Sequence, residues 1–375
     1  MASSAAVISS HSRALISPNS ISSFHNNPNL PKLIHNLPSL TSNFTALSSS
    51  KLTICSVAKT TTPEVELQYS SNFSTPAPNN SWSEFASKVS GEWDGFGADF
   101  TTEGKPIELP ESVVPEAYRE WEVKVFDWQT QCPTLAEPQN LLLSYKSIKL
   151  LPTVGCEADA ATIHTTDSKN IGGEQSNKTL GFGYQSTGCY VSVWVVDETE
   201  RYKVIEVEHC LVDPRDKESR VRVIQIVRFE GSEMKLVKIR VFCEQWYGPF
   251  RNGDQLGGCA IRDSAFASTV KLNASDVAGA WQGTTALASY QSSSNELIQE
   301  VRGSSIDKIV RDENDLIGLP RQLWCSLKED GNGETYAEAG WLLDRDFAIS
   351  STCILSSDCQ VKEIAVRNET AATIT

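Results

Sequence analysis

The chain has 375 residues, and 47 acidic residues against 33 basic ones give it a formal net charge of −14. This balance argues against a nucleic-acid-binding protein and against docking on an anionic membrane, because both surfaces demand clustered Lys and Arg. Nine Trp and 40% hydrophobic residues indicate a globular protein with cores. No stretch approaches the roughly 20 apolar residues of a membrane-spanning helix, so no integral membrane segment is expected.

The first part of the chain has a different composition from the rest. No Asp or Glu occurs before Glu64, and the stretch is rich in Ser, Asn and Thr with a few Lys and Arg. An acid-poor, hydroxyl-rich leader is typical of an organellar transit peptide. We therefore predict a chloroplast transit peptide over residues 1–57, a disordered tether over residues 58–80, and a mature protein in the stroma. An ordinary disordered tail is the alternative.

An internal repeat divides the remaining chain. Residues 87–95 and 275–283 share the pattern S-x-V-x-G-x-W-x-G without gaps. Each copy follows a short helix-start signal; the first is the capping box of Ser81 and Glu84. We expect each half to begin with a helical turn, then a Gly, then a Trp that enters a strand and packs in the core. The residues of this signature are Gly91, Trp93, Gly279 and Trp281.

Apolar residues that follow the two copies recur with a period of two, which predicts strands with one buried face. Ile205, Val207, His209 and Leu211 share a face, with Glu206 and Glu208 opposite; Val237, Ile239, Val241 and Cys243 share another. The parity slips between Val223 and Ile224, which predicts a bulge. Long helical periodicities are absent. The prediction is an all-β protein with two antiparallel barrels in tandem, over residues 81–269 and 270–375.

A short helix that leads to G-x-W at the start of an up-and-down barrel resembles the calycin superfamily of lipocalin-type barrels. Residues 91–100, residues 116–123 and the tail of the second half more closely resemble a family of plant chloroplast biogenesis factors required for ATP synthase, which have two calycin-like barrels. The resemblance covers nearly the whole mature chain. It implies a stromal assembly factor that binds the β and γ subunits of the soluble catalytic head.

The residues themselves suggest neither an enzyme nor a cofactor protein. His209 and Cys210 are adjacent on a predicted strand and so point to opposite faces, which prevents them from acting on one substrate. No C-x-x-C occurs among the ten Cys, so we expect no metal site. We assign no catalytic, cofactor-binding or metal-binding residue. A redox role for Cys353 and Cys359 stays open.

One aromatic cluster is the best candidate for partner binding. Trp246, Tyr247, Phe250 and Arg251 lie where a predicted strand runs into a Gly-Pro turn, and Trp, Tyr and Arg dominate binding hot spots. The alternative is that they close a barrel mouth or pack between the barrels. A second candidate is an acidic surface that could steer a basic partner, unless it is simply solvated. Its residues are Asp307, Asp312, Glu313, Asp315, Glu329 and Asp330.

Two functions follow for such a protein. The first is a non-enzymatic assembly factor, a monomer without cofactor, whose two rigid barrels hold two client subunits and so raise their effective concentration. The second is a lipocalin-type carrier of an apolar small molecule, or a tetrapyrrole- or bilin-handling protein. An eight-stranded barrel is either filled by side chains or left hollow for one ligand. The content of the interior therefore distinguishes the two.

Overall fold

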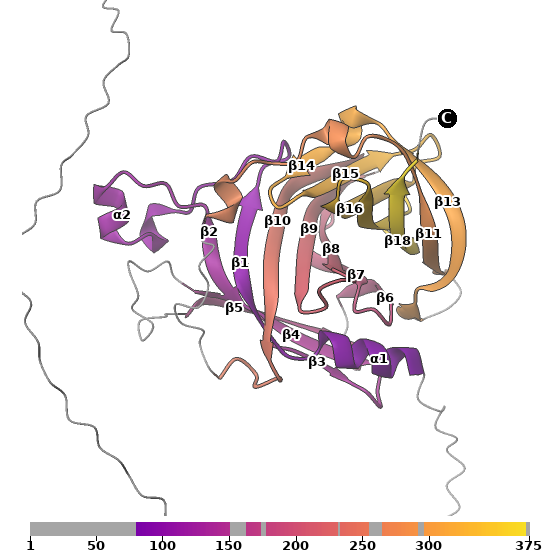
Figure 1. Cartoon of the computed structure of the whole chain (residues 1–375), viewed down its shortest axis with the longest axis horizontal. Helices are drawn as coiled ribbons and strands as arrows, with labels where there is room; N and C mark the ends of the chain where they lie inside the picture. Colours follow the sequence, from indigo (N-terminus) through magenta and orange to yellow (C-terminus); the bar gives the residue numbers. More distant parts are fainter. Residues whose placement is uncertain are drawn as a thin grey trace, which may run out of the picture. The chain divides into compact units, whose positions relative to one another are not determined.

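The computed structural model describes residues 80–150, 163–173, 178–231, 233–254, 265–291 and 296–372. The predicted transit peptide and all but the last residue of the predicted tether lie outside these residues. Strands make up most of the described chain, and the prediction of an all-β protein is confirmed. The strands form two sheets (Figure 1).

The first sheet has eleven strands, and neighbouring strands in it are antiparallel except for one pair. Along the main path the strands follow the order β12-β6-β7-β8-β9-β10-β1-β2-β4-β3, and β5 pairs with β4. Their bounds are β1 Glu92–Phe100, β2 Asp127–Gln131, β3 Thr134–Glu137, β4 Leu142–Leu150, β5 Ile163–Ile171, β6 Thr179–Tyr184, β7 Tyr190–Glu198, β8 Tyr202–Val212, β9 Ser219–Glu230, β10 Glu233–Gly248 and β12 Ile298–Glu300.

The second sheet has seven antiparallel strands in the order β13-β11-β18-β17-β16-β15-β14. Their bounds are β11 Gly279–Ser289, β13 Arg302–Arg311, β14 Ile317–Leu319, β15 Leu323–Glu329, β16 Thr335–Asp344, β17 Phe347–Leu355 and β18 Val361–Ala371. The predicted boundary near residue 270 separates the two sheets except at β12. That strand comes from the second half of the chain and pairs in parallel with β6 of the first sheet.

Helices are few and short. α1 spans Asn80–Val89, α2 spans Glu116–Glu120, and 3₁₀ turns cover Glu111–Val113, Phe266–Ser268, Ala274–Asp276 and Glu313–Asp315. The helix expected before each G-x-W strand is therefore present, as α1 before β1 and as a 3₁₀ turn before β11. The predicted capping box is wrong, because α1 already includes Ser81 and the Ser81 hydroxyl is buried without a hydrogen-bond partner.

Strand pairing among the described residues closes neither sheet into a ring. In the first sheet β5 and β12 are not paired with each other, and in the second sheet β13 and β14 are not. Side chains reach across the first sheet instead: Lys169 of β5 contacts Glu206 of β8 at 2.7 Å and Glu208 at 3.3 Å. The coarser prediction of two β sheets holds, whereas closed barrels are not seen in the pairing.

The two sheets share their hydrophobic core. One core cluster joins Val191, Val207 and Val227 of the first sheet to Cys353 and Ile364 of the second. A further cluster joins the outer faces of β1, β9 and β10 to β15, β16 and β17. Residues 80–372 accordingly belong to one compact unit. The two halves are not separate bodies joined by a linker.

The period-two pattern predicted the apolar faces of most strands correctly, but it misplaced the bulge. Ile205, Val207, His209 and Leu211 are buried together toward the second sheet. The extra residue lies in β10 at Val237, where the register with β9 shifts between Leu236 and Lys238. Val237 is therefore 49% exposed instead of sharing the buried face of Ile239 and Val241. β9 breaks the alternation because both of its faces are buried.

Polar side chains also connect the sheets at their shared core. His209 Nδ1 of β8 lies 2.8 Å from Ser351 Oγ of β17. Gln225 of β9 donates from Nε2 to the backbone oxygen of Ser326 at 2.9 Å. Burial lowers the pKa of His209 from 6.5 to about 4. The imidazole is therefore neutral in the folded protein at neutral pH.

Because His209 is buried in its neutral form, we expect the folded protein to lose stability in acid. Between pH 6.5 and 4 the unfolded chain binds a proton at His209 that the folded chain does not, so the free energy of unfolding falls as the pH falls. The full effect is about 3 kcal/mol. Urea unfolding at pH 7 and pH 4.5 should show that His209→Gln removes this part of the pH dependence. The exposed control His164→Gln should keep it, and an unchanged dependence in His209→Gln would contradict the assignment.

Candidate functional site

Both tryptophans of the repeated signature are anchored in the same way. Trp93 Nε1 donates to the backbone oxygen of Val89 at 2.9 Å, and Trp281 Nε1 donates to that of Val277 at 3.0 Å. Both rings are buried. The Val and Trp of the repeat therefore form a hydrogen bond that fixes the chain between the helical turn and the strand. The two tryptophans are thus part of the packed core.

The last glycine of each copy lets a neighbouring strand come close. A Cβ at Gly95 would lie 1.9 Å from the backbone oxygen of Cys243, and one at Gly283 would lie 2.0 Å from that of Asn368. In the strand register Gly95 faces Glu244 and Gly283 faces Glu369. Each copy of the repeat thus brings a buried glutamate next to its tryptophan.

An arginine completes each group. The Arg220 guanidinium lies 4.1 Å from the centre of the Trp93 ring, and its Nε donates to Glu244 at 2.7 Å. Arg311 lies 6.0 Å from the Trp281 ring and donates to Glu369 at 2.7 Å. Both arginines are almost fully buried. The sequence repeat did not reveal them, because they come from β9 and β13, which are not equivalent strands.

Further charged residues fill the inside of the first sheet. Glu208 is fully buried and accepts hydrogen bonds from Tyr145 at 2.7 Å, Tyr190 at 3.0 Å and Arg222 at 3.0 Å. Burial alone would raise the pKa of Glu208, but the charges of Lys169 and Arg222 lower it to about 2. Together with the aromatic side chains of α1, this network occupies the inside of the sheet.

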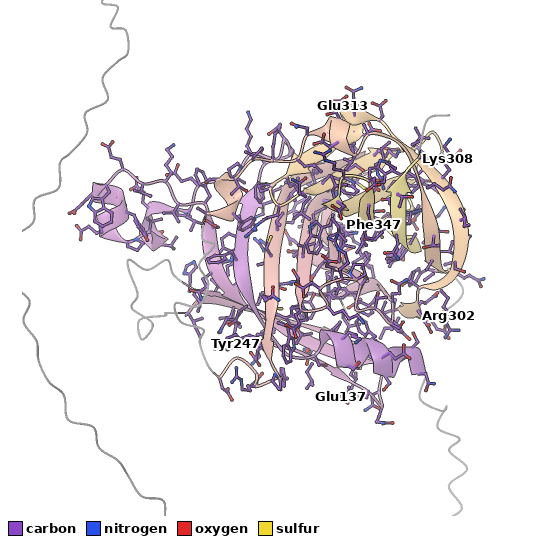
Figure 2. The ribbon with its side chains drawn as sticks, viewed as in Figure 1. Glu137, Tyr247, Arg302, Lys308, Glu313 and Phe347 are labelled. Atoms are coloured by element: carbon purple, nitrogen blue, oxygen red, sulfur yellow. The ribbon has the colours of Figure 1, made fainter. Side chains whose placement is uncertain are left out.

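The predicted partner-binding cluster divides into buried and exposed members. Trp246 is half-buried, donates from Nε1 to the Ser90 backbone oxygen at 3.3 Å and packs over Gly91, where a Cβ would lie 2.1 Å from that nitrogen. These contacts pack the Trp246 ring against the start of β1. Tyr247 is 55% exposed at the end of β10 (Figure 2). Phe250 and Arg251 are half-exposed.

The acidic surface residues predicted from the sequence serve local turns. Asp312 accepts from the backbone nitrogen of Asn314 at the start of a 3₁₀ turn, and Asp330 accepts from those of Asn332 and Glu334 in a hairpin turn. Asp307, Glu313, Asp315 and Glu329 are exposed. These hydrogen bonds account for the presence of Asp312 and Asp330, so no binding partner is needed to explain the two residues.

A cleft of about 620 Å³ lies between the outer face of the first sheet and the second sheet. The aromatic cluster borders it, since Trp246 and Tyr247 are among its lining residues. Arg321 also lines it and has a positive φ of 61°, as does Gln322. Both residues lie in the turn between β14 and β15, and tight hairpin turns commonly need positive φ at two successive residues. Other lining residues are Asp94, Phe96, Gln245, Phe266 and Trp341.

Asp94 is the unusual group of this cleft. Its side chain is only 7% exposed, and its Oδ1 atom has no hydrogen-bond partner. Burial raises the pKa of Asp94 to about 6, an effect that the hydrogen bond with Gln131 partly offsets and that the nearby charges of Glu92 and Glu244 increase. At neutral pH the folded protein therefore keeps a buried carboxylate ionised at a cost in free energy.

A second exposed feature is an arm of residues 110–124 between β1 and β2. The backbone hydrogen bond from Leu109 to Val125 closes its base, and Leu109 packs on the inner face of the first sheet, against the cluster of Trp128 and Phe242. Trp121 is 61% exposed at the end of α2, with the Tyr118 ring 6.2 Å away. Figure 1 shows α2 projecting from the sheets. The sequence offered no period by which to place Trp121 outside.

The remaining residues with possible chemistry are deeply buried. Burial raises the pKa of Cys359 to about 12, and the pKa of Cys353 is raised further in the same way. Both thiols are therefore protonated in the folded state. Within the described residues, no group of three or more His, Cys, Asp and Glu side chains has a metal-binding arrangement. In the same part of the chain, no helix combines the length and apolar character needed to cross a membrane.

Comparisons with known proteins do not assign the chain to a family. No protein-family model matches the chain, and no curated protein matches it. A protein of unknown function from the DUF3598 family of Nostoc punctiforme is 12% identical, with a TM-score of 0.47 over 78% of this chain and 99% of that one. Outer membrane phospholipase A from Escherichia coli is 7% identical, with a TM-score of 0.15 over 77% and 98%. At these TM-scores neither likeness indicates a function.

The buried arginine of the second sheet should be essential for stability. Arg311→Met leaves Glu338 and Glu369 buried without their cation, so we expect a loss of about 3–5 kcal/mol in the free energy of unfolding. Adding Glu338→Gln and Glu369→Gln should recover part of the loss. Denaturant unfolding measures both, with the exposed Arg345→Met as the control. A loss no larger than that of the control would contradict this role.

Removing the charge of Asp94 should stabilise the protein, whereas removing that of Arg311 should destabilise it. Because its pKa is raised from 3.8 to about 6, the unfolded state is favoured more and more as the pH rises through this window. Asp94→Asn removes the effect and should stabilise the protein by about 3 kcal/mol at pH 7.5, with no gain at pH 3.5. Thermal unfolding at the two pH values tests this. A variant less stable than the unmodified protein at pH 7.5 would show that the carboxylate has a stabilising partner.

Proposed function

We propose that this protein is a non-enzymatic assembly factor in the chloroplast stroma that binds the β and γ subunits of the soluble catalytic head of ATP synthase. The client identity rests on the resemblance of residues 91–100 and 116–123, and the compartment rests on the acid-free leader. The observation that carries protein binding is Trp121, whose ring is largely exposed on the arm.

The arm has the properties of a contact for a protein surface. Besides Trp121 it exposes Val123 (47%), and it carries four glutamates against two basic residues. An exposed aromatic ring with apolar and charged neighbours is the usual composition of a binding hot spot. Its acidic balance favours a partner with a basic surface. The segment that resembles the biogenesis factors, residues 116–123, includes α2 and Trp121.

The carrier function receives less support. A lipocalin-type carrier keeps a hollow inside its barrel, whereas here Glu208, Arg220, Arg222 and several aromatic rings occupy the inside of the first sheet. These side chains form hydrogen bonds and ion pairs with one another, and a ligand inside the sheet would have to displace them. A surface-binding role requires no such change. The calycin-like nature of the two sheets remains part of the proposal.

The arm should be needed for client binding. Trp121→Ala removes the exposed ring without touching the core, so affinity for the isolated ATP synthase β or γ subunit should fall about tenfold or more while the melting temperature stays unchanged. Biolayer interferometry with each purified subunit measures this. Val270→Ala, at an 89% exposed residue outside the arm, is the control.

Two results would contradict the proposal in different ways. Equal affinity of Trp121→Ala and the unmodified protein would show that the arm is not the contact. If the unmodified protein binds neither subunit, the assignment of the β and γ subunits as its clients is wrong.

A further inference from the structure

The cleft between the sheets contains one acid with unused hydrogen-bonding capacity. Glu244 is paired with Arg220 at 2.7 Å and with Arg222 at 2.7 Å. Glu92 accepts from the backbone nitrogens of the turn after β10. Asp94, two residues after Glu92 in β1, has only Gln131 as a side-chain hydrogen-bond partner, and its Oδ1 atom has none.

The surroundings of Asp94 suit a cation with a flat face. Tyr247, Trp246 and Trp341 line the same cleft and offer aromatic rings. A guanidinium group pairs with a carboxylate through two N–H donors and also stacks on aromatic rings, whereas an ammonium group does this less well. The cleft volume of about 620 Å³ lies in the usual range for small-ligand sites and is ample for one arginine side chain.

We infer that Asp94 anchors an arginine side chain of a bound polypeptide in this cleft. The partner class rests on the proposed function, because the arginine would belong to a client subunit, but the cation site itself does not. The overall charge of −14 agrees with a basic partner segment. The cost of keeping Asp94 ionised when the cleft is empty is offset when the cation enters.

The charged groups around Asp94 determine how binding depends on pH. Glu92 of β1 and Glu244 of β10 raise the pKa of Asp94, and Arg251 of the following turn lowers it. Arg220 of β9 is held by Glu244, and Arg321 lines the opposite side of the cleft. With a pKa of about 6, Asp94 is mostly ionised at pH 7.5 and mostly protonated at pH 5. An arginine should therefore bind in the neutral range and leave in mild acid.

Two matched probes test the site on the full chain. N-acetyl-arginine amide carries the cation, and N-acetyl-citrulline amide has nearly the same shape without it. Ligand-observed NMR titration at pH 7.5 should give an affinity at least tenfold higher for the arginine probe. Lowering the pH to 5 should abolish most of this preference.

Variants separate the cation site from its client. Asp94→Asn should lose the preference for arginine and its pH dependence, while Asp276→Asn, an exposed change of the same charge outside the cleft, should keep both. Equal binding of the two probes, or an arginine preference retained in Asp94→Asn, would overturn the site. If the probes behave as expected but the β and γ subunits bind Asp94→Asn as tightly as the unmodified protein, the cation site stands and the client arginine is rejected.

Discussion

Buried ion pairs inside the first sheet fix how its strands lie against one another. Arg222 alone joins Glu208 of β8 to Glu244 of β10, and Lys169 brings in β5, which is not paired directly with β8 in the described part of the chain. Because a buried charge without its partner costs several kcal/mol, these strands must keep their spacing and register together. The tryptophan of the repeated signature joins the same network through Arg220. The shape of the sheet thus follows from charge pairing as much as from apolar burial.

The second sheet contains the same kind of tryptophan, glutamate and arginine group, but its arginine comes from a differently placed strand. In the first sheet the arginine that covers the tryptophan comes from β9, two strands away from β1 along the sheet; in the second it comes from β13, which pairs directly with β11. The glutamates, by contrast, are equivalent, because each lies opposite the last glycine of its repeat. The two halves therefore share a group of tryptophan, glutamate and arginine, but the arginine comes from strands at different positions in the two sheets.

The sequence allowed the β class, the two repeats and most apolar strand faces to be predicted, because these depend on neighbours within ten residues. It misled at Glu206 and Glu208, where alternation indicates a solvent face. Their partners, Lys169 and Arg222, are distant in the chain, and nothing local indicates that both faces of β8 are buried. The packing of Trp246 against Gly91 also depends on a residue distant in the chain, so composition alone did not indicate it. The cleft at Asp94 could not be predicted, since it exists only where two sheets meet.

The parallel strand β12 has a consequence for the order in which the protein forms. β6 receives its outer partner from residues 298–300, which follow β11 of the second sheet in the chain. A first sheet that folds before the second half is in place therefore has an open edge at β6, and open edges invite pairing with other chains. A truncation between residues 270 and 298 would leave that edge uncovered. The first sheet is thus completed only together with the second half of the chain.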